Sequence, residues 1–269
     1  MRRLRGFALA CHTAPTVGVT LIMTAFAWSL GWRGGDLALM ALTVLVGQLS
    51  VGWCNDAHDS DLDARAGRAG KPTVAQDVSA RALWIAAIAA LTAAIGLSWL
   101  VAGFVGGSFH VLALAVAWLY NLRLSRTAWS WLPYAVAFGV APLFLSVGLD
   151  GELPPAWMVI AFAIVAISAH LANALPDLES DRAAGLGGLA VRLGAQRATR
   201  LCWLLLAIGT GVIALSTLAA SPLIAVALVI LFAGAALLGA RRPDRSATFN
   251  ALLALVAIDV AAIVFLPAL

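Results

Sequence analysis

Carboxylate and amide side chains gather in one short stretch of this chain, directly after an apolar run that ends at Cys54. The stretch spans residues 55–63 and reads Asn-Asp-Ala-His-Asp-Ser-Asp-Leu-Asp. If the apolar helix continues through it at roughly 100° per residue, four side chains fall within an arc of roughly 100°, and Asp61 points away. The four are Asn55, Asp56, Asp59 and Asp63. We expect these four to act together as ligands.

A second stretch of the same character lies between residues 173 and 185 and matches the first at one constant spacing. The matched pairs are Asn55 with Asn173, Asp59 with Asp177, Asp61 with Glu179, Asp63 with Asp181, and Gly67 with Gly185. Here too Asn173, Asp177 and Asp181 share one helix face, whereas Glu179 points elsewhere. The correspondence indicates an internal duplication, which is a known way to build a central site in a membrane protein.

The two acidic stretches predict a metal site. Acids three or four residues apart on a helix repel one another, so a cation must offset them. Carboxylate and amide oxygens suit Mg²⁺, which commonly joins one or two carboxylates to substrate phosphates. The sequence therefore predicts Mg²⁺ as cofactor and a diphosphate as ligand, with Asp56, Asp59, Asp63, Asp177 and Asp181 as catalytic residues. A solvated loop that merely carries acids is the alternative, but its charges would be scattered without facial order.

Basic residues follow the first acidic stretch at Arg65, Arg68 and Lys71. They are candidates for binding the phosphate oxygens and for stabilising a departing diphosphate. Each of them fits equally well with a simpler role, in which positive charge only marks the inner face of the membrane.

The elements that must position these residues are apolar helices. Hydrophobic residues make up 62% of the chain and charged residues only 11%, whereas soluble domains carry about 25% charged residues. A membrane span needs roughly 20 mostly apolar residues. We expect an all-α polytopic membrane protein of about nine helices, forming one domain with two related halves at approximately 1–130 and 131–269. The expected spans are 13–31, 36–54, 81–102, 108–121, 130–149, 155–175, 199–219, 221–240 and 247–267.

The distribution of positive charge predicts the orientation. With a cytoplasmic N-terminus, all but one of the 17 Lys and Arg residues fall on the inner side, and only Arg33 lies outside. We therefore expect an integral protein of the cytoplasmic membrane, with both acidic stretches in long polar inner loops, 55–80 and 176–198, and the C-terminus outside. The net charge of +4 then reflects topology, so membrane lipids and no nucleic acid are the expected surroundings.

The N-terminus and the cysteines are expected to be structural. Arg2, Arg3 and Arg5 precede an apolar stretch, as they would in a signal peptide. Because residues 11–13 interrupt this stretch, we interpret it as the first helix and not as a signal peptide. The three cysteines show no zinc or redox spacing, and we expect them to be buried packing residues.

Residues 55–63 fit the pattern NDxxDxxxD and residues 177–181 fit DxxxD. The pair resembles the Asp-rich motifs of the UbiA superfamily of intramembrane prenyltransferases. The resemblance extends over the whole chain, because that family has nine helices, motifs on the inner side and two related halves. It implies a helical bundle with a central cavity capped by the motif loops, in which two Mg²⁺ ions hold the diphosphate of an allylic isoprenoid between the motifs.

Three segments depart from the family pattern. Where the family has a Tyr followed closely by a Lys, this chain has Tyr120 to Arg126, so the resemblance makes Tyr120, Arg123 and Arg126 candidate diphosphate contacts, although Tyr120 also fits an interfacial aromatic. Many members carry a Lys-Thr pair after the second motif. Here Gly187-Gly188 stands there, so that contact is missing or has moved to Arg182 or Arg192.

The third departure is His12, which stands roughly where members acting on aromatic acids place an Arg. We mark His12 as a candidate acceptor-binding residue that orients the acceptor or moves a proton. A hydrogen-bonded structural histidine is the alternative.

The leading hypothesis is Mg²⁺-dependent transfer of a prenyl group from an isoprenyl diphosphate to a lipophilic or aromatic acceptor. The close alternative is a membrane-bound terpene cyclase that acts on the diphosphate alone. A cation-coupled transporter is a distant alternative, because transporter sites usually lie near the bilayer midplane, whereas these acids occupy loops and helix ends on one face.

Overall fold

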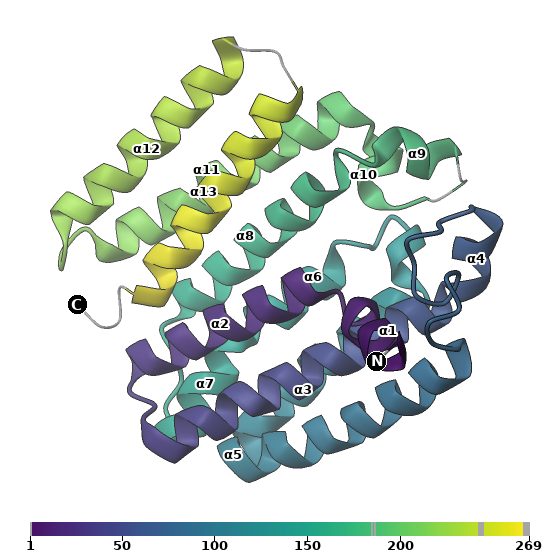
Figure 1. Ribbon diagram of the computed structural model, residues 1–269. Helices are drawn as coiled ribbons and strands as arrows, with labels where there is room; N and C mark the ends of the chain where they lie inside the picture. Colours follow the sequence, from purple (N-terminus) through teal and green to yellow (C-terminus); the bar gives the residue numbers. More distant parts are fainter. Residues whose placement is uncertain (1, 184, 186, 242–244, 266–269) are drawn as a thin grey trace. The chain divides into compact units, whose positions relative to one another are not determined.

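The apolar runs of the sequence form helices, because in hydrocarbon every backbone polar group must find its partner within its own segment. The computed structural model describes residues 2–183, 185, 187–241 and 245–265, and in these ranges it contains helices and turns but no strand (Figure 1). Among the residues so described, six helical segments are long and apolar enough to cross a membrane. The expectation of an all-α membrane protein is confirmed, and the number of nine helices stays a prediction.

The first of two structural units comprises residues 1–123 and 144–152. Its helices are α1 (Arg2–Ala10), α2 (Thr13–Leu30), α3 (Gly34–His58), α4 (Ser60–Arg65), α5 (Ala80–Leu122) and most of α7 (Ala141–Asp150). Helix α3 packs mainly on α5. Gly47 of α3 allows the close approach, because a Cβ there would lie 2.9 Å from Leu114. Small residues at such contacts let helices pack in lipid, where hydrophobic burial gives no driving force.

Helix α5 is interrupted at Gly103, whose φ of 65° and ψ of 177° are not helical. The expected connection between two spans at 103–107 is therefore confirmed at its first residue, although the second helical part begins earlier than the expected residue 108. The two parts pack closely, because a Cβ at Gly107 would lie 2.5 Å from the carbonyl oxygen of Ser98. A hydrogen bond of 2.7 Å between Ser98 Oγ and His110 Nδ1 joins them.

The second unit comprises residues 124–143 and 153–269. Its elements are a short 3-10 turn η1 (Leu124–Arg126), α6 (Leu132–Gly139), α8 (Ala156–Ala174), α9 (Leu178–Ala183), α10 (Leu189–Leu193), α11 (Ala195–Thr217), α12 (Pro222–Arg241) and α13 (Arg245–Phe265). Helix α8 packs on α6, α11 and α13 and is the centre of this unit (Figure 1). Leu171, Cys202, Leu206 and Leu252 form the core of the packing.

Two expectations need correction. The segments 55–80 and 176–198 are not simply loops, because each contains helix: the last turn of α3 and α4 in the first, α9 and α10 in the second. Acidic residues in the first turns of α4 and α9 favour helix there, since they interact well with free N–H groups. The N-terminal residues form a separate helix, α1, that ends before His12. All three cysteines are buried and free, as expected.

Candidate functional site

The first acidic motif continues the helical path of α3 into α4. The Asp59 N–H donates to the Asn55 carbonyl at 2.9 Å, and the Asp63 N–H donates to the Asp59 carbonyl at 2.8 Å. These bonds stack the motif on successive helical turns, as its spacing predicts. Asp56 and Asp63 are each 1% exposed, whereas Asp61 is exposed. The expected separation of Asp61 from the buried acids is confirmed.

Each of the two buried carboxylates uses one oxygen for an ion pair. Asp56 Oδ1 accepts from Lys71 Nζ at 2.6 Å and from His12 Nε2 at 2.9 Å. Asp63 Oδ1 accepts from Arg68 Nη1 at 3.0 Å. Taking a carboxylate out of water costs several kcal/mol unless a partner offsets the loss. The ion pairs with Lys71 and Arg68 therefore offset part of the free energy that it costs to bury Asp56 and Asp63.

In the described ranges, the second oxygen of each buried carboxylate has no such partner. Asp56 Oδ2 and Asp63 Oδ2 are buried and accept no hydrogen bond from any residue that the structure describes. Thr73 Oγ1, on the loop that also carries Lys71, shares this property. A buried acceptor without a donor costs about 1–3 kcal/mol, and more when it is charged. Such atoms in a native fold require an explanation, and a bound ion or a catalytic role is among the usual ones.

These two orphaned oxygens fit Mg²⁺. Among residues 2–183, 185, 187–241 and 245–265, no group of three His, Cys, Asp or Glu side chains is arranged to hold a metal by itself. Mg²⁺ does not need such a cage, because it keeps several waters and is usually bound by one or two carboxylates and substrate phosphates. Asp56 Oδ2 and Asp63 Oδ2 are therefore candidate ligands, with the half-buried Asp59 between them in the sequence.

The amide of Asn55 is oriented by Asn121, a residue that the sequence did not single out. Asn55 Nδ2 donates to Asn121 Oδ1 at 3.3 Å, and Asn121 Nδ2 donates to the Val51 carbonyl at 2.9 Å. Because the nitrogen of Asn55 is used in this way, its oxygen stays available as a ligand atom. A buried amide at the end of an apolar helix was the signal that could have identified Asn121.

The remaining candidates near the first motif lie at its edge. The Arg68 and Lys71 side chains are 45% and 25% exposed, so both can pair with an acid and still meet a ligand from solvent. Arg65 and Arg123 are exposed, and Tyr120 is half-buried. Among the candidate basic residues of this unit, the structure thus brings Arg68 and Lys71 onto the acids.

The second acidic motif belongs to the second unit and is more open. The Asp181 N–H donates to the Asp177 carbonyl at 2.8 Å, which places these residues one turn apart. Asn173, Asp177 and Glu179 are exposed, and Asp181 is half-buried. Because most of its side chains are exposed, this motif does not carry the desolvation cost of the buried acids in the first motif.

Gly187 and Gly188 are explained by packing on the turn η1. A Cβ at Gly187 would lie 2.8 Å from the Arg126 carbonyl oxygen, and one at Gly188 would lie 3.0 Å from the Ser125 carbonyl oxygen. Arg192 Nε donates to the Gly187 carbonyl at 2.6 Å. The segment that departs from the family's Lys-Thr pair is thus a close backbone contact, with no room for a Cβ at Gly187 and little room at Gly188.

Ser130 and His170 complete this contact, and the sequence did not single out either. The Ser130 hydroxyl oxygen accepts from the Leu189 N–H at 3.0 Å, and the same hydroxyl shares a hydrogen bond of 3.0 Å with His170 Nε2. Tyr134 covers the imidazole at a centroid distance of 4.4 Å. Arg182 Nη2 adds a bond of 3.1 Å to the Val191 carbonyl. The loop after the second motif is therefore well anchored within its unit.

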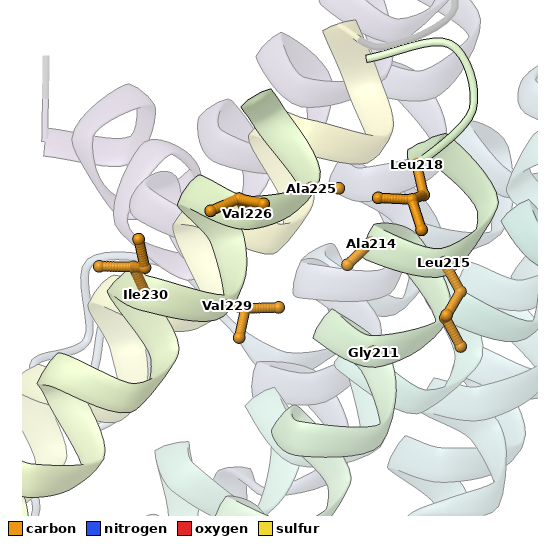
Figure 2. A pocket seen from close by; sticks show the side chains of 8 residues that line it. All are labelled: Gly211, Ala214, Leu215, Leu218, Ala225, Val226, Val229 and Ile230. Carbon is orange, nitrogen blue, oxygen red and sulfur yellow. The ribbon is translucent and has the colours of Figure 1, made fainter. Parts of the chain in front are cut away.

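An apolar groove lies between α11 and α12 and has a volume of about 290 Å³ (Figure 2). Its side chains are aliphatic, among them Leu215, Leu218, Val226 and Ile230 (Figure 2). A surface without polar atoms cannot bind a diphosphate, so the groove is not the candidate site.

Comparison with known proteins places the chain in a family. A model described as the UbiA prenyltransferase family matches residues 15–258. Protoheme IX farnesyltransferase from Thermus thermophilus is 31% identical over 238 residues, which cover 84% of this chain and 38% of that protein. The chain thus spans less than half the length of this curated relative.

Solved structures share the fold. A UbiA homolog from Archaeoglobus fulgidus bound to DMAPP and Mg²⁺ superposes with a TM-score of 0.72 at 19% identity, covering 96% of this chain and 98% of that one. A digeranylgeranylglyceryl phosphate synthase gives a TM-score of 0.74 at 14% identity, covering 100% and 99%. At these identities the likeness concerns the fold alone. The family match over most of the chain shows that this integral membrane protein belongs to the UbiA prenyltransferase family.

Proposed function

We propose that this protein transfers a prenyl group from an isoprenyl diphosphate to a lipophilic or aromatic acceptor within the membrane, with Mg²⁺ as cofactor. One observation carries the proposal: Asp56 and Asp63 are buried, and each has one oxygen paired with a basic side chain and one oxygen without a partner among the residues that the structure describes. Family membership and a relative that is a protoheme IX farnesyltransferase support it, as does a homolog bound to DMAPP and Mg²⁺.

In the proposed reaction, the bond between the allylic carbon and the diphosphate oxygen breaks, and the diphosphate leaves with the electron pair. The acceptor then supplies the electron pair of the new bond to that carbon and releases a proton. Mg²⁺, when bound, stabilises the negative charge that grows on the departing diphosphate.

The residues of the first motif have different roles in the proposed reaction. Asp56 and Asp63 would offer Oδ2 to the cation, and Asn55 would offer its amide oxygen. Lys71 and Arg68 stand beside the two acids and stabilise charge on the diphosphate oxygens as the bond breaks. The apolar helices exclude water, which would otherwise capture an allylic cation before the acceptor does.

We propose that the second motif supplies further ligands, because it repeats the spacing and residue types of the first. Its candidate ligands are Asn173, Asp177 and Asp181. The further diphosphate contacts that we propose are Arg65, Tyr120, Arg123, Arg126 and Arg182. Of these, Arg182 already donates to a carbonyl of its own unit.

The distribution of positive charge supports an orientation for this site. We propose that the N-terminus and both motifs face the cytoplasm and that the C-terminus lies outside, in the cytoplasmic membrane. A water-soluble diphosphate would then reach the motifs from the cytoplasm, while a lipophilic acceptor would arrive through the bilayer.

Product analysis in lipid tests the proposal. Purified protein in nanodiscs is incubated with dimethylallyl, geranyl and farnesyl diphosphate, with or without Mg²⁺, and with a panel of acceptors that includes protoheme IX and phenols. Mass spectrometry should find a prenylated acceptor only when Mg²⁺ is present. Asp63→Asn should lower diphosphate release at least about 100-fold, the usual loss when one electrostatic group of an active site is removed.

Asp61→Asn is the matched control, because it changes an exposed acid of the same motif. It should keep the wild-type rate. A cyclised hydrocarbon or terpene alcohol formed without any acceptor would show that the protein is a terpene cyclase and not a transferase. Equal diphosphate release by Asp63→Asn and the wild type would refute the site itself.

A further inference from the structure

His12 reaches the first motif from a strained turn between α1 and α2. Its backbone has φ 54° and ψ 66°, the left-handed region, which costs a residue with a Cβ about 1–2 kcal/mol. Strain of this kind persists only where surrounding contacts impose it, and it gathers at functional sites. The contacts of His12 are therefore informative.

The hydrogen bond of His12 has a defined direction. An ionised carboxylate only accepts, so His12 Nε2 must carry a proton and donate it to Asp56 Oδ1 across 2.9 Å. Lys71 Nζ donates to the same oxygen at 2.6 Å. Two donors on Oδ1 fix the rotation of the carboxylate about its bond to Cβ. Oδ2, which has no partner in the described part of the chain, is thereby held in one direction.

The turn that carries His12 is pressed onto α3. A Cβ at Gly52 would overlap the backbone of Cys11, with 2.7 Å to its carbonyl carbon and 2.8 Å to its Cα. Thr16 Oγ1 donates to the Cys11 carbonyl at 2.6 Å and holds the other side of the turn. Gly52 lies four residues, about one helical turn, before Asp56, so the contact places the backbone next to His12 one turn along α3 from the carboxylate that the imidazole reaches.

Helix α1 fastens the same turn to the loop that carries Lys71. Arg2 Nε pairs with Asp77 at 2.6 Å, and Arg2 Nη2 donates to the Ala75 carbonyl at 3.0 Å. Trp53 Nε1 of α3 donates to the Phe7 carbonyl at 2.9 Å. Helix α1 thus bridges α3 and the loop 71–78, which are the two segments that carry Asp56 and Lys71.

We propose that His12 is a positioning residue for Asp56, held by α1 as a strap, and that it fixes the carboxylate so that Oδ2 faces the cation. The inference rests on the proposed function, because it concerns the same cation site. It gives His12 a role toward the metal ligand in place of contact with the acceptor. Hydrogen bonds to ligating groups typically contribute 10–100-fold to metal affinity.

The test measures binding of Mn²⁺ alone by the full-length protein in detergent, using the EPR signal of the free ion. His12→Gly removes the imidazole while suiting the left-handed backbone, so a loss cannot come from strain. His58→Gly is the matched control, because His58 is exposed in the same motif. Asp56→Asn shows how much Mn²⁺ affinity is lost when the proposed ligand itself is changed.

We expect His12→Gly to weaken Mn²⁺ binding about 10–100-fold and His58→Gly to bind as the wild type does. Wild-type affinity in His12→Gly, together with weak binding by Asp56→Asn, would overturn the positioning role and leave the proposed function intact. Equal affinity in the wild type and Asp56→Asn would instead overturn the cation site and the function that depends on it. Circular dichroism checks that each variant is folded.

Discussion

Replacing Gly52 with alanine tests how the N-terminal turn is held against α3. The added methyl group would meet backbone atoms of Cys11, which cannot rotate away as a flexible side chain could. The turn must therefore shift, and with it His12. We expect two effects of Gly52→Ala. Its free energy of unfolding should be lower than that of a variant with alanine at an uncrowded glycine, and it should bind Mn²⁺ more weakly.

The magnitude follows from two opposing terms. Overpacking of a close contact costs about 1–3 kcal/mol. Alanine in place of glycine inside a helix gains about 0.8–1 kcal/mol. Gly18→Ala in α2 is the matched control, because no atom of the described residues lies within 4 Å of its added Cβ, so only the gain in helix propensity applies to it. The two variants should therefore differ by about 1–3 kcal/mol in free energy of unfolding.

The assay is unfolding in mixed micelles of mild detergent and SDS, followed by tryptophan fluorescence, with Mn²⁺ affinity measured on the same samples. The reasoning predicts that Gly52→Ala unfolds at lower SDS than Gly18→Ala and binds Mn²⁺ more weakly. Equal stability and equal affinity in the two variants would show that the turn does not depend on contact with α3.

Two further predictions concern the second unit. Ser130→Ala leaves the Leu189 N–H without this acceptor and removes the hydroxyl that is bonded to His170 Nε2, so the free energy of unfolding should fall by about 1–3 kcal/mol; no change in SDS unfolding would show that water replaces the hydroxyl. Thr210→Val removes the hydroxyl that donates to both oxygens of the buried Asp259 and should cost a similar amount, whereas Thr210→Ser should unfold as the wild type does. Equal stability of the valine and serine variants would contradict that account.

Much of the helical arrangement could be predicted because it depends on local pattern. The apolar runs predicted the bounds of α2, α8 and α11 within a few residues, because a helix that crosses the hydrocarbon core needs about 20 mostly apolar residues in a row. The spacing of the first motif predicted that Asp56 and Asp63 would differ from Asp61, because helical periodicity alone decides which side chains share a face.

The rest of the site depends on contacts between segments far apart in the sequence. Asp56 and His12 are separated by 44 positions, and the hydrogen bond between them follows from the turn that Gly52 admits. Asn121 lies next to Tyr120, which the family pattern emphasised, yet it is Asn121 that orients Asn55. No periodicity in a single segment contains such information, because it arises only when helices pack.

The central claim is that Asp56 and Asp63 hold a divalent cation through their Oδ2 atoms, which accept no hydrogen bond within the described part of the chain. Anomalous diffraction from crystals soaked with Mn²⁺ and a non-hydrolysable isoprenyl diphosphate tests it most directly. We predict an anomalous peak about 2.1 Å from Asp56 Oδ2 or Asp63 Oδ2, with Lys71 and Arg68 still paired with the Oδ1 atoms. A peak beside Asp61, or ordered diphosphate with no cation at either carboxylate, would contradict the claim.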